Sequence, residues 1–189
     1  FPHDGFTYED TLNYSVGFRG PNGRDFLSGF ADYALENDLG GVHYADPDQT
    51  VRQHAGRVEG YELDRVRDMM IDMLKQPEDF KQWFGRFVST PRHELDIAPA
   101  EPPYAPEEVR EALLNGETLT RLSGLRVLNV EGSFFINGEA YAPADARATD
   151  LLSRYTEVDA LLLGEALDNP AFIAGLTGLI NQGYWYFAE

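Results

Sequence analysis

The sequence predicts an α+β fold, and three observations lead to this class. Apolar residues recur at helical spacing in several segments on both sides of residue 100. Residues 117–141 instead contain short apolar runs separated by turn dipeptides, which is typical of a small antiparallel sheet. The chain has 189 residues, of which 43% are apolar and 25% charged, as in an ordinary folded globular protein.

The first element is a strand over residues 11–19, where apolar and small polar residues alternate. One face carries Leu12, Tyr14, Val16 and Phe18, and the other carries Asn13, Ser15 and Gly17. The turn sequence of residues 20–23 ends the strand. A helix follows over residues 24–37, because its apolar positions have helical spacing.

Two more helices are expected before residue 91. The first spans residues 62–75, and its methionines Met69, Met70 and Met73 belong either to a core or to an adaptable binding surface. The second begins at Pro77 and ends before Pro91. Its aromatic face is either core or the contact surface of a dimer, and consists of Phe80, Trp83, Phe84 and Phe87.

Residues 97–106 contain four prolines and predict a stiff, extended linker, which places a domain boundary near residue 100. Beyond it we expect a helix over 106–114, strands near 117–122, 125–130, 133–136 and 139–141, helices near 145–154, 158–167 and 170–181, and a strand near 184–187. Asn137-Gly138 is a strong hairpin signal. Helices combined with a small antiparallel sheet suggest a winged-helix-like module over residues 101–189.

The chain is strongly acidic, with 15 Lys and Arg against 32 Asp and Glu and a net charge of −17. Residues 101–189 alone hold 5 basic and 14 acidic residues. This charge argues against direct binding of nucleic acid and favours basic protein partners. No apolar run approaches the roughly 20 residues that a membrane span needs, so no membrane partner is expected. The absence of cysteine excludes disulfides, thiolate metal sites and a cysteine nucleophile.

Common catalytic signatures are missing, including a glycine-rich phosphate loop, a GxSxG elbow and an HExxH helix. His43, His54 and His93 have no mutual spacing that suggests a site, and we interpret them as surface or hydrogen-bonded histidines. His3 differs, since it precedes the strand whose small polar face could line a metal-centred β-barrel. The chain opens Phe-Pro-His-Asp-Gly without Met or a signal sequence, so we expect a processed or truncated piece of a longer protein.

Several short segments of the sequence resemble those of the bacterial JmjC-type ribosomal oxygenases, which are cupin-fold enzymes. The resemblance extends over essentially the whole chain, and the segments that carry it are residues 1–5 (FPHDG), 13–19 (NYSVGFR), 28–33 (SGFADY), 80–85 (FKQWFG), 92–99 (RHELDIAP) and 183–185 (GYW). The resemblance is to the C-terminal portion of that family only.

The resemblance implies three regions. Residues 1–20 would close a double-stranded β-helix barrel, residues 21–100 would form a helical dimerisation region, and residues 101–189 would be the winged-helix-like domain. His3 matches the distal histidine of the family's Fe(II) site, and Asn13 and Ser15 match the strand that lines the metal and 2-oxoglutarate pocket. The remaining ligands, a His-x-Asp pair, would lie upstream of Phe1 together with the anchor for 2-oxoglutarate.

The same resemblance implies the activity. The full-length protein would be a cytoplasmic, homodimeric dioxygenase that uses Fe(II) and 2-oxoglutarate to hydroxylate an arginine of a basic large-subunit ribosomal protein. Three facial ligands are needed for such an iron centre, so this piece alone should be inactive. The alternative from another class is a non-catalytic, acidic dimerisation or protein-interaction module.

Overall fold

The computed structural model describes residues 20–47, 50–52, 54, 56–142 and 144–187. The chain divides into two compact units, one ending at Asn37 and the other beginning at Asp38. The strand expected over residues 11–19 lies outside the described residues, as does the closing strand of a barrel expected within residues 1–20. In the described part of the first unit, helix α1 (Gly23–Glu36) confirms the helix expected over 24–37.

Local side-chain caps explain where several helices begin. The Oδ1 atom of Asn22 accepts hydrogen bonds from the backbone N–H groups of Arg24 and Asp25, at 2.8 and 3.3 Å. Asp25 in turn accepts from the N–H of Asn22. In the second unit, the carboxylate of Glu108 accepts from the N–H of Ala105 in the same way at the start of α4 (Pro106–Leu114). Such caps satisfy N–H groups that have no partner within the helix.

Helices α2 (Gly60–Leu74) and α3 (Pro77–Ser89) occupy the positions predicted from the sequence. Helix α2 has no buried residue, whereas α3 buries Trp83, Gly85 and Ser89. An ion pair between Arg52 and Glu62 fixes the first turn of α2 to the preceding loop, and it lowers the pKa of the Glu62 carboxyl.

The described residues of the second unit form four more helical segments after α4 and six short strands. The helical segments are α5 (Ala146–Arg154), α6 (Ala160–Leu163), the 3₁₀ helix η1 (Gly164–Asp168) and α7 (Pro170–Asn181). The strands are β1 (Leu119–Arg121), β2 (Val127–Val130), β3 (Ser133–Ile136), β4 (Glu139–Tyr141), β5 (Glu157–Val158) and β6 (Trp185–Phe187).

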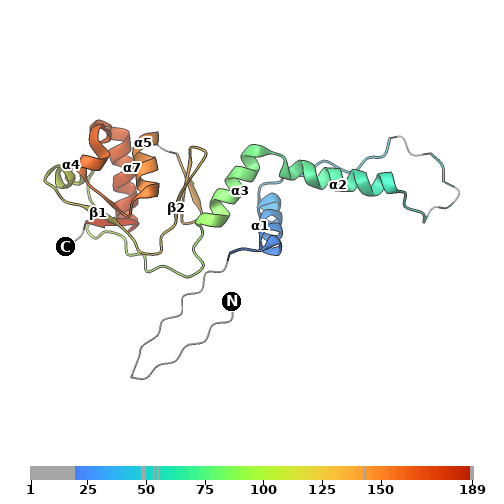
Figure 1. Ribbon diagram of the computed structural model, residues 1–189, viewed down its shortest axis with the longest axis horizontal. Helices are drawn as coiled ribbons and strands as arrows, with labels where there is room; N and C mark the ends of the chain where they lie inside the picture. The colour runs from blue at the N-terminus through green and yellow to red at the C-terminus, as the bar shows by residue number, and fades with distance from the viewer. Residues whose placement is uncertain (1–19, 48–49, 53, 55, 143, 188–189) are drawn as a thin grey trace, which may run out of the picture. The chain divides into compact units, whose positions relative to one another are not determined.

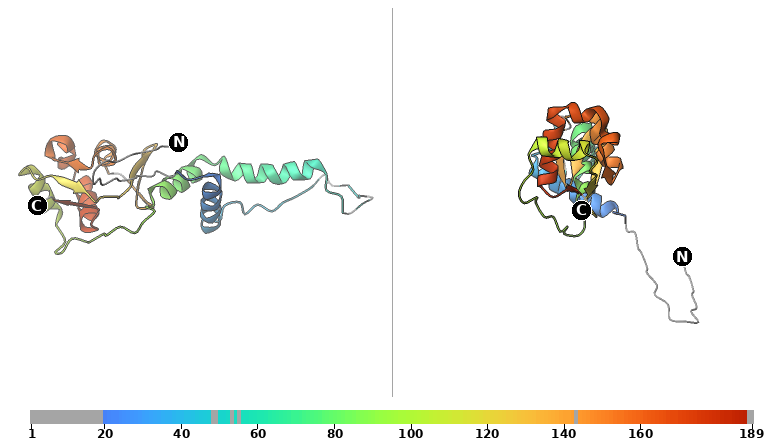
Figure 2. Two further views of the ribbon diagram at one scale, coloured as in Figure 1. Left: turned by 60° about the horizontal axis from the view of Figure 1, so that its bottom comes forward. Right: turned by 90° about the vertical axis from the view of Figure 1, so that its left-hand side faces the viewer.

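The strands form two antiparallel sheets where the sequence suggested one (Figures 1 and 2). Strands β2, β3 and β4 form a meander, with Asn137 and Gly138 at the hairpin turn as expected. Strand β1 does not belong to this sheet. It pairs with β5 and β6, and Arg121 lies opposite Trp185. A turn dipeptide indicates that the two strands on either side of it pair. It gives no information about the pairing of β1 with β6, which lie more than 60 residues apart in the sequence.

The helix expected near residues 158–167 is also different in the structure. Val158 belongs to β5 and pairs with Leu119, and the following helix is interrupted at Gly164. Gly164 has a φ angle of 54°, in the left-handed region that ends a regular α-helix. The apolar residues of this segment are therefore distributed over a strand, one turn of α-helix and a 3₁₀ helix.

The main hydrophobic core lies between α4, α5, α7 and the β5-β1-β6 sheet, and Trp185 on β6 is fully buried in it. Helices α4 and α7 pack directly against each other (Figure 1). On the other sheet, α3 packs against β2, β3 and β4. No helix among the described residues is long and apolar enough to cross a bilayer.

Candidate functional site

The three residues predicted for metal and cofactor binding, His3, Asn13 and Ser15, lie outside the described residues, so their roles stay predictions. Within the described ranges, no group of three or more His, Asp or Glu side chains is placed to hold a metal ion. The residues that the structure describes therefore do not fit an iron centre by themselves.

One well-defined feature is the junction between α3 and the β2-β3-β4 sheet. Gly85 faces Phe135, whose side chain is fully buried. A Cβ atom at position 85 would lie only 2.3 Å from the Phe135 ring. Because only glycine allows this approach, Gly85 sets the distance between the helix and the sheet.

Hydrogen bonds join the end of α3 to the same sheet. The buried hydroxyl of Ser89 accepts from the N–H of Gly138 at 3.0 Å and donates to the carbonyl of Arg86. Arg126 directly precedes β2, and its guanidinium donates to the carbonyls of Val88 and Thr90, at 3.0 and 3.3 Å. These contacts satisfy carbonyls that the helix end leaves open and so fix α3 on the sheet.

The proline-rich segment of residues 96–104 is held against the end of α7. The side chain of Asn181 accepts from the N–H of Tyr104 at 2.8 Å and donates to the Tyr104 carbonyl at 3.0 Å. The N–H of Ala100 donates to the Asn181 carbonyl. At Gly183 a Cβ atom would lie 2.3 Å from the Ala98 carbonyl oxygen. The segment contains neither helix nor strand, and it is docked on the module that follows it.

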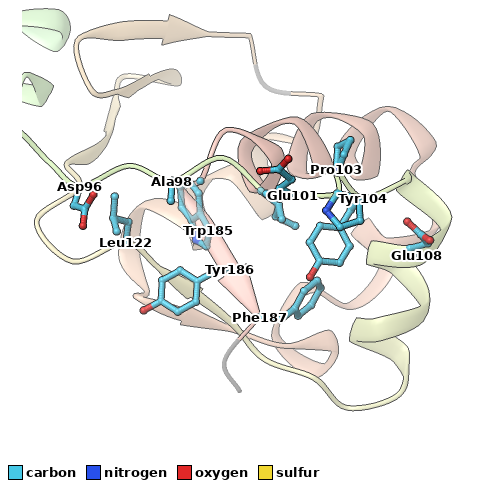
Figure 3. A pocket seen from close by; sticks show the side chains of 14 residues that line it. Asp96, Ala98, Glu101, Pro103, Tyr104, Glu108, Leu122, Trp185, Tyr186 and Phe187 are labelled. Atoms are coloured by element: carbon cyan, nitrogen blue, oxygen red, sulfur yellow. The ribbon is translucent and has the colours of Figure 1, made fainter.

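A cavity of about 710 Å³ lies between this segment and β6, and we call it the β6 cavity. Figure 3 shows its aromatic side chains, Tyr104, Trp185, Tyr186 and Phe187, with the carboxylates of Asp96, Glu101 and Glu108 around them. The rings of Tyr104 and Phe187 meet edge to face, with centroids 5.7 Å apart. An aromatic surface surrounded by carboxylates suits a cationic ligand.

A second hollow, of about 490 Å³, lies on α2 and the loop before it. It is mostly apolar and is lined by Val42, Tyr44, Val66, Met69, Met70 and Met73 among others. Met70 is 55% exposed, and none of the three methionines is buried. Of the two interpretations of the methionine cluster, the structure therefore favours an adaptable surface over a core.

Tyr141 connects the β2-β3-β4 sheet to the end of α7. Its hydroxyl donates to Oε1 of Gln182 at 3.1 Å. Burial, and after it the neighbouring Tyr184, raises the pKa of Tyr141 to about 12. Arg121 is a half-buried titratable group of the same module. Its guanidinium donates to the carbonyls of Leu152 and Ser153, and burial lowers its pKa.

The two sheets and the helices around them define a winged-helix protein, and a family model confirms this class. The ROXA-like winged helix model matches residues 72–186, and the chain belongs to that family. The match begins before α3, so it includes the helix that covers the β2-β3-β4 sheet.

The chain is also similar to individual proteins. It is 50% identical over 187 residues to the ribosomal protein uL16 3-hydroxylase of Escherichia coli K12, a match that covers 99% of this chain and 50% of that protein. The crystal structure of the E. coli ribosomal oxygenase YcfD matches with a TM-score of 0.86 and 50% identity, over 92% of this chain and 48% of that one. The same protein in complex with cobalt and 2-oxoglutarate matches with a TM-score of 0.85 and 49% identity, over the same shares of the two chains.

These similarities confirm the resemblance to bacterial ribosomal oxygenases. The chain spans about half the length of the relatives it matches. The β6 cavity is not predicted by any local pattern of the sequence. Its sequence contributors are a proline-rich segment and an aromatic cluster, Tyr184 to Phe187, which by themselves indicate only a linker and a terminal strand.

Proposed function

We propose that this chain is part of a dioxygenase that uses Fe(II) and 2-oxoglutarate to hydroxylate an arginine side chain of a large-subunit ribosomal protein. The observation that carries the proposal is the 50% identity to a uL16 3-hydroxylase over 99% of the chain. The complex of the similar YcfD structure with cobalt and 2-oxoglutarate supports the cofactor pair, because cobalt is a common substitute for iron. The acidic charge of −17 suits a basic ribosomal substrate, and a cytoplasmic location follows from that substrate.

In this proposal His3 is one iron ligand, and Asn13 and Ser15 line the cosubstrate pocket. Iron would supply the activation of oxygen, while the protein supplies binding, orientation and exclusion of water. The described residues contain no group of three or more His, Asp or Glu that could hold the metal by themselves. Their role is to hold the substrate-bearing protein and the second subunit, through the winged-helix module and the helices before it.

The activity is tested on the full-length protein with a peptide from uL16. We expect one oxygen atom to be added to an arginine, as measured by mass spectrometry, only when both Fe(II) and 2-oxoglutarate are present. His3→Ala should abolish the product. A protein that leaves the peptide unchanged under these conditions would favour the non-catalytic interaction module instead.

The 189-residue chain by itself should bind Fe(II) or Mn(II) only weakly. A facial metal site needs three protein ligands, and His3 offers one. Isothermal titration calorimetry should therefore show no stoichiometric, tight binding. Micromolar binding that is lost in His3→Ala would contradict this expectation and show that the chain holds a more complete site.

We also propose that the protein is a homodimer and that the apolar surface of α2 takes part in the contact. Val66, Met70 and Leu74 are 46%, 55% and 43% exposed, although they lie on the apolar side of an amphipathic helix. Met70→Glu should shift the sedimentation coefficient towards that of a monomer. Arg67→Gln changes the charge of the same helix by one unit at an exposed position and is the control. A dimer that survives Met70→Glu would remove α2 from the contact.

A further inference from the structure

We propose that the β6 cavity is a binding site for an arginine side chain presented by a basic peptide segment of a partner protein. The site belongs to the winged-helix module, and it does not depend on whether the full-length protein is an oxygenase. Its occupant is a protein segment, because the charge of the cavity repels nucleic-acid phosphates.

The charges that line the cavity are of one sign. Asp96, Glu101 and Glu108 contribute carboxylates, and none of the fourteen lining residues is Lys, Arg or His. Glu108 uses one oxygen to accept from the N–H of Ala105. The carboxylates of Asp96 and Glu101 have no ion pair or hydrogen bond within the part of the chain that the structure describes. Two unpaired carboxylates at one cavity attract a cation.

Aromatic rings form the surface between these carboxylates. Tyr104 and Tyr186 are 39% and 46% exposed, so their faces are accessible to a ligand. Phe187 packs edge to face on Tyr104 and holds that ring in place. A guanidinium group stacks on such rings more readily than an ammonium group, because it is planar and more weakly hydrated. The pattern of rings and carboxylates therefore favours arginine over lysine.

A buried donor adds a polar group at the same place. Trp185 lines the cavity and is fully buried, and its indole Nε1–H has no hydrogen-bond acceptor among the described residues. A buried N–H without a partner costs free energy, and a carbonyl group that reached it through a small shift of the cavity wall would recover that cost. A peptide carries such carbonyls along its backbone, whereas a free cation does not. The donor is thus a second, independent indication that the ligand is a peptide.

The walls of the cavity are rigid enough to act as a preformed site. Asn181 holds Tyr104 through two hydrogen bonds, and the close approach of Gly183 to Ala98 fixes the other end of the segment. The cavity volume of about 710 Å³ lies within the range of about 300–1,000 Å³ that is usual for ligand sites. An arginine side chain with the adjoining backbone fits such a volume.

The test is binding of a fluorescein-labelled nine-residue peptide of alternating Arg and Ser to the full 189-residue chain, followed by fluorescence anisotropy. Salt at about 150 mM reduces the Debye length to about 8 Å and suppresses attraction by the distant charges. The comparison peptide has citrulline in place of each arginine, which keeps the shape and removes the charge. A third peptide has lysine in place of each arginine, which keeps the charge and removes the planar group. We expect the arginine peptide to bind at least 10-fold more tightly than the citrulline peptide, and more tightly than the lysine peptide.

Two variants locate the binding. Asp96→Asn with Glu101→Gln should weaken the arginine peptide at least 10-fold. Glu117→Gln with Glu165→Gln removes the same charge from exposed residues that do not line the cavity, and should change binding by less than twofold. In NMR spectra, the indole N–H resonance of Trp185 should shift on addition of the peptide, with that of Trp83 as the internal reference.

Three outcomes would overturn the proposal. Equally tight binding of the citrulline peptide would show that the cavity does not recognise the positive charge of arginine. Equal weakening by the two double variants would show attraction by the overall charge without a defined site. Tighter binding of a single-stranded RNA oligonucleotide than of the arginine peptide would assign the module to nucleic acid.

Discussion

Gly85 determines how closely α3 can approach the β2-β3-β4 sheet. Gly85→Ala should destabilise the protein by about 1–3 kcal/mol, because a methyl group 2.3 Å from the Phe135 ring forces the helix or the ring to move. The gain in helix propensity of up to about 1 kcal/mol is too small to offset this. Urea denaturation measures the change.

Gly175 is the matched control for this substitution. It also lies inside a helix, but a Cβ atom there meets nothing within 4 Å. Gly175→Ala should therefore stabilise the protein by about 0.5–1 kcal/mol, from helix propensity alone. If the two variants changed the stability by the same amount, close packing against Phe135 would not explain the effect of Gly85→Ala.

Tyr141 gives the stability a pH dependence in the alkaline range. Its pKa in the fold is raised to about 12, from about 10 in an unfolded chain, so the folded state holds the proton more tightly. This contribution is complete below about pH 10 and is lost as the pH rises to about 12. Tyr141→Phe should flatten the fall in unfolding free energy between these values, and at neutral pH it should cost about 0.5–1.5 kcal/mol for the bond to Gln182.

The exposed Tyr155 provides the control for the loss of a tyrosine hydroxyl. Tyr155→Phe should leave the stability at neutral pH close to that of the parent protein. A Tyr141→Phe profile that runs parallel to the parent profile between pH values of about 10 and 12 would contradict the assignment.

At the scale of whole elements, Asn181 links the proline-rich segment to α7. Its side chain makes two hydrogen bonds to the backbone of Tyr104, so Asn181→Ala leaves both backbone groups without that partner. We expect the amide of Tyr104 to exchange hydrogen at least 10-fold faster. The amide of Val109, in the buried part of α4, should exchange unchanged. Equal exchange rates at Tyr104 in both proteins would show that other contacts hold the segment.

Most helices were predictable because their signals are local. Pro77, Pro106 and Pro170 each stand at the start of a helix, and the apolar spacing that follows defines its length. The β5-β1-β6 sheet was not predictable in the same way. Leu119 pairs with both Val158 and Phe187, and nothing near Leu119 in the sequence indicates those partners.

The candidate sites were predictable to different degrees. Resemblance identified His3, Asn13 and Ser15 as site residues, and their placement stays a prediction. The β6 cavity was missed, because it depends on Asn181 and Gly183 holding a segment that precedes them by about 80 residues. In the sequence, the prolines near residue 100 and the aromatic residues 184–187 are far apart. They line one cavity only after the proline-rich segment has docked on the folded module.

At the scale of the whole molecule, the position of the domain boundary can be tested by truncation. The sequence places it near residue 100, whereas α3 packs on a sheet that lies beyond that point, and the family match begins at residue 72. A fragment of residues 101–189 lacks α3 and uncovers Phe135, which is fully buried in the longer chain. Exposing such a side chain costs about 1.5–3 kcal/mol.

We therefore expect the fragment 72–189 to unfold at a clearly higher urea concentration than the fragment 101–189. The fragment 72–189 with Gly85→Leu is the control for chain length, since it retains α3 but prevents its close approach to Phe135. Its stability should fall towards that of 101–189. If 101–189 were as stable as 72–189, the boundary near residue 100 would be correct, and α3 would be an attachment to the winged-helix module that adds nothing to its stability.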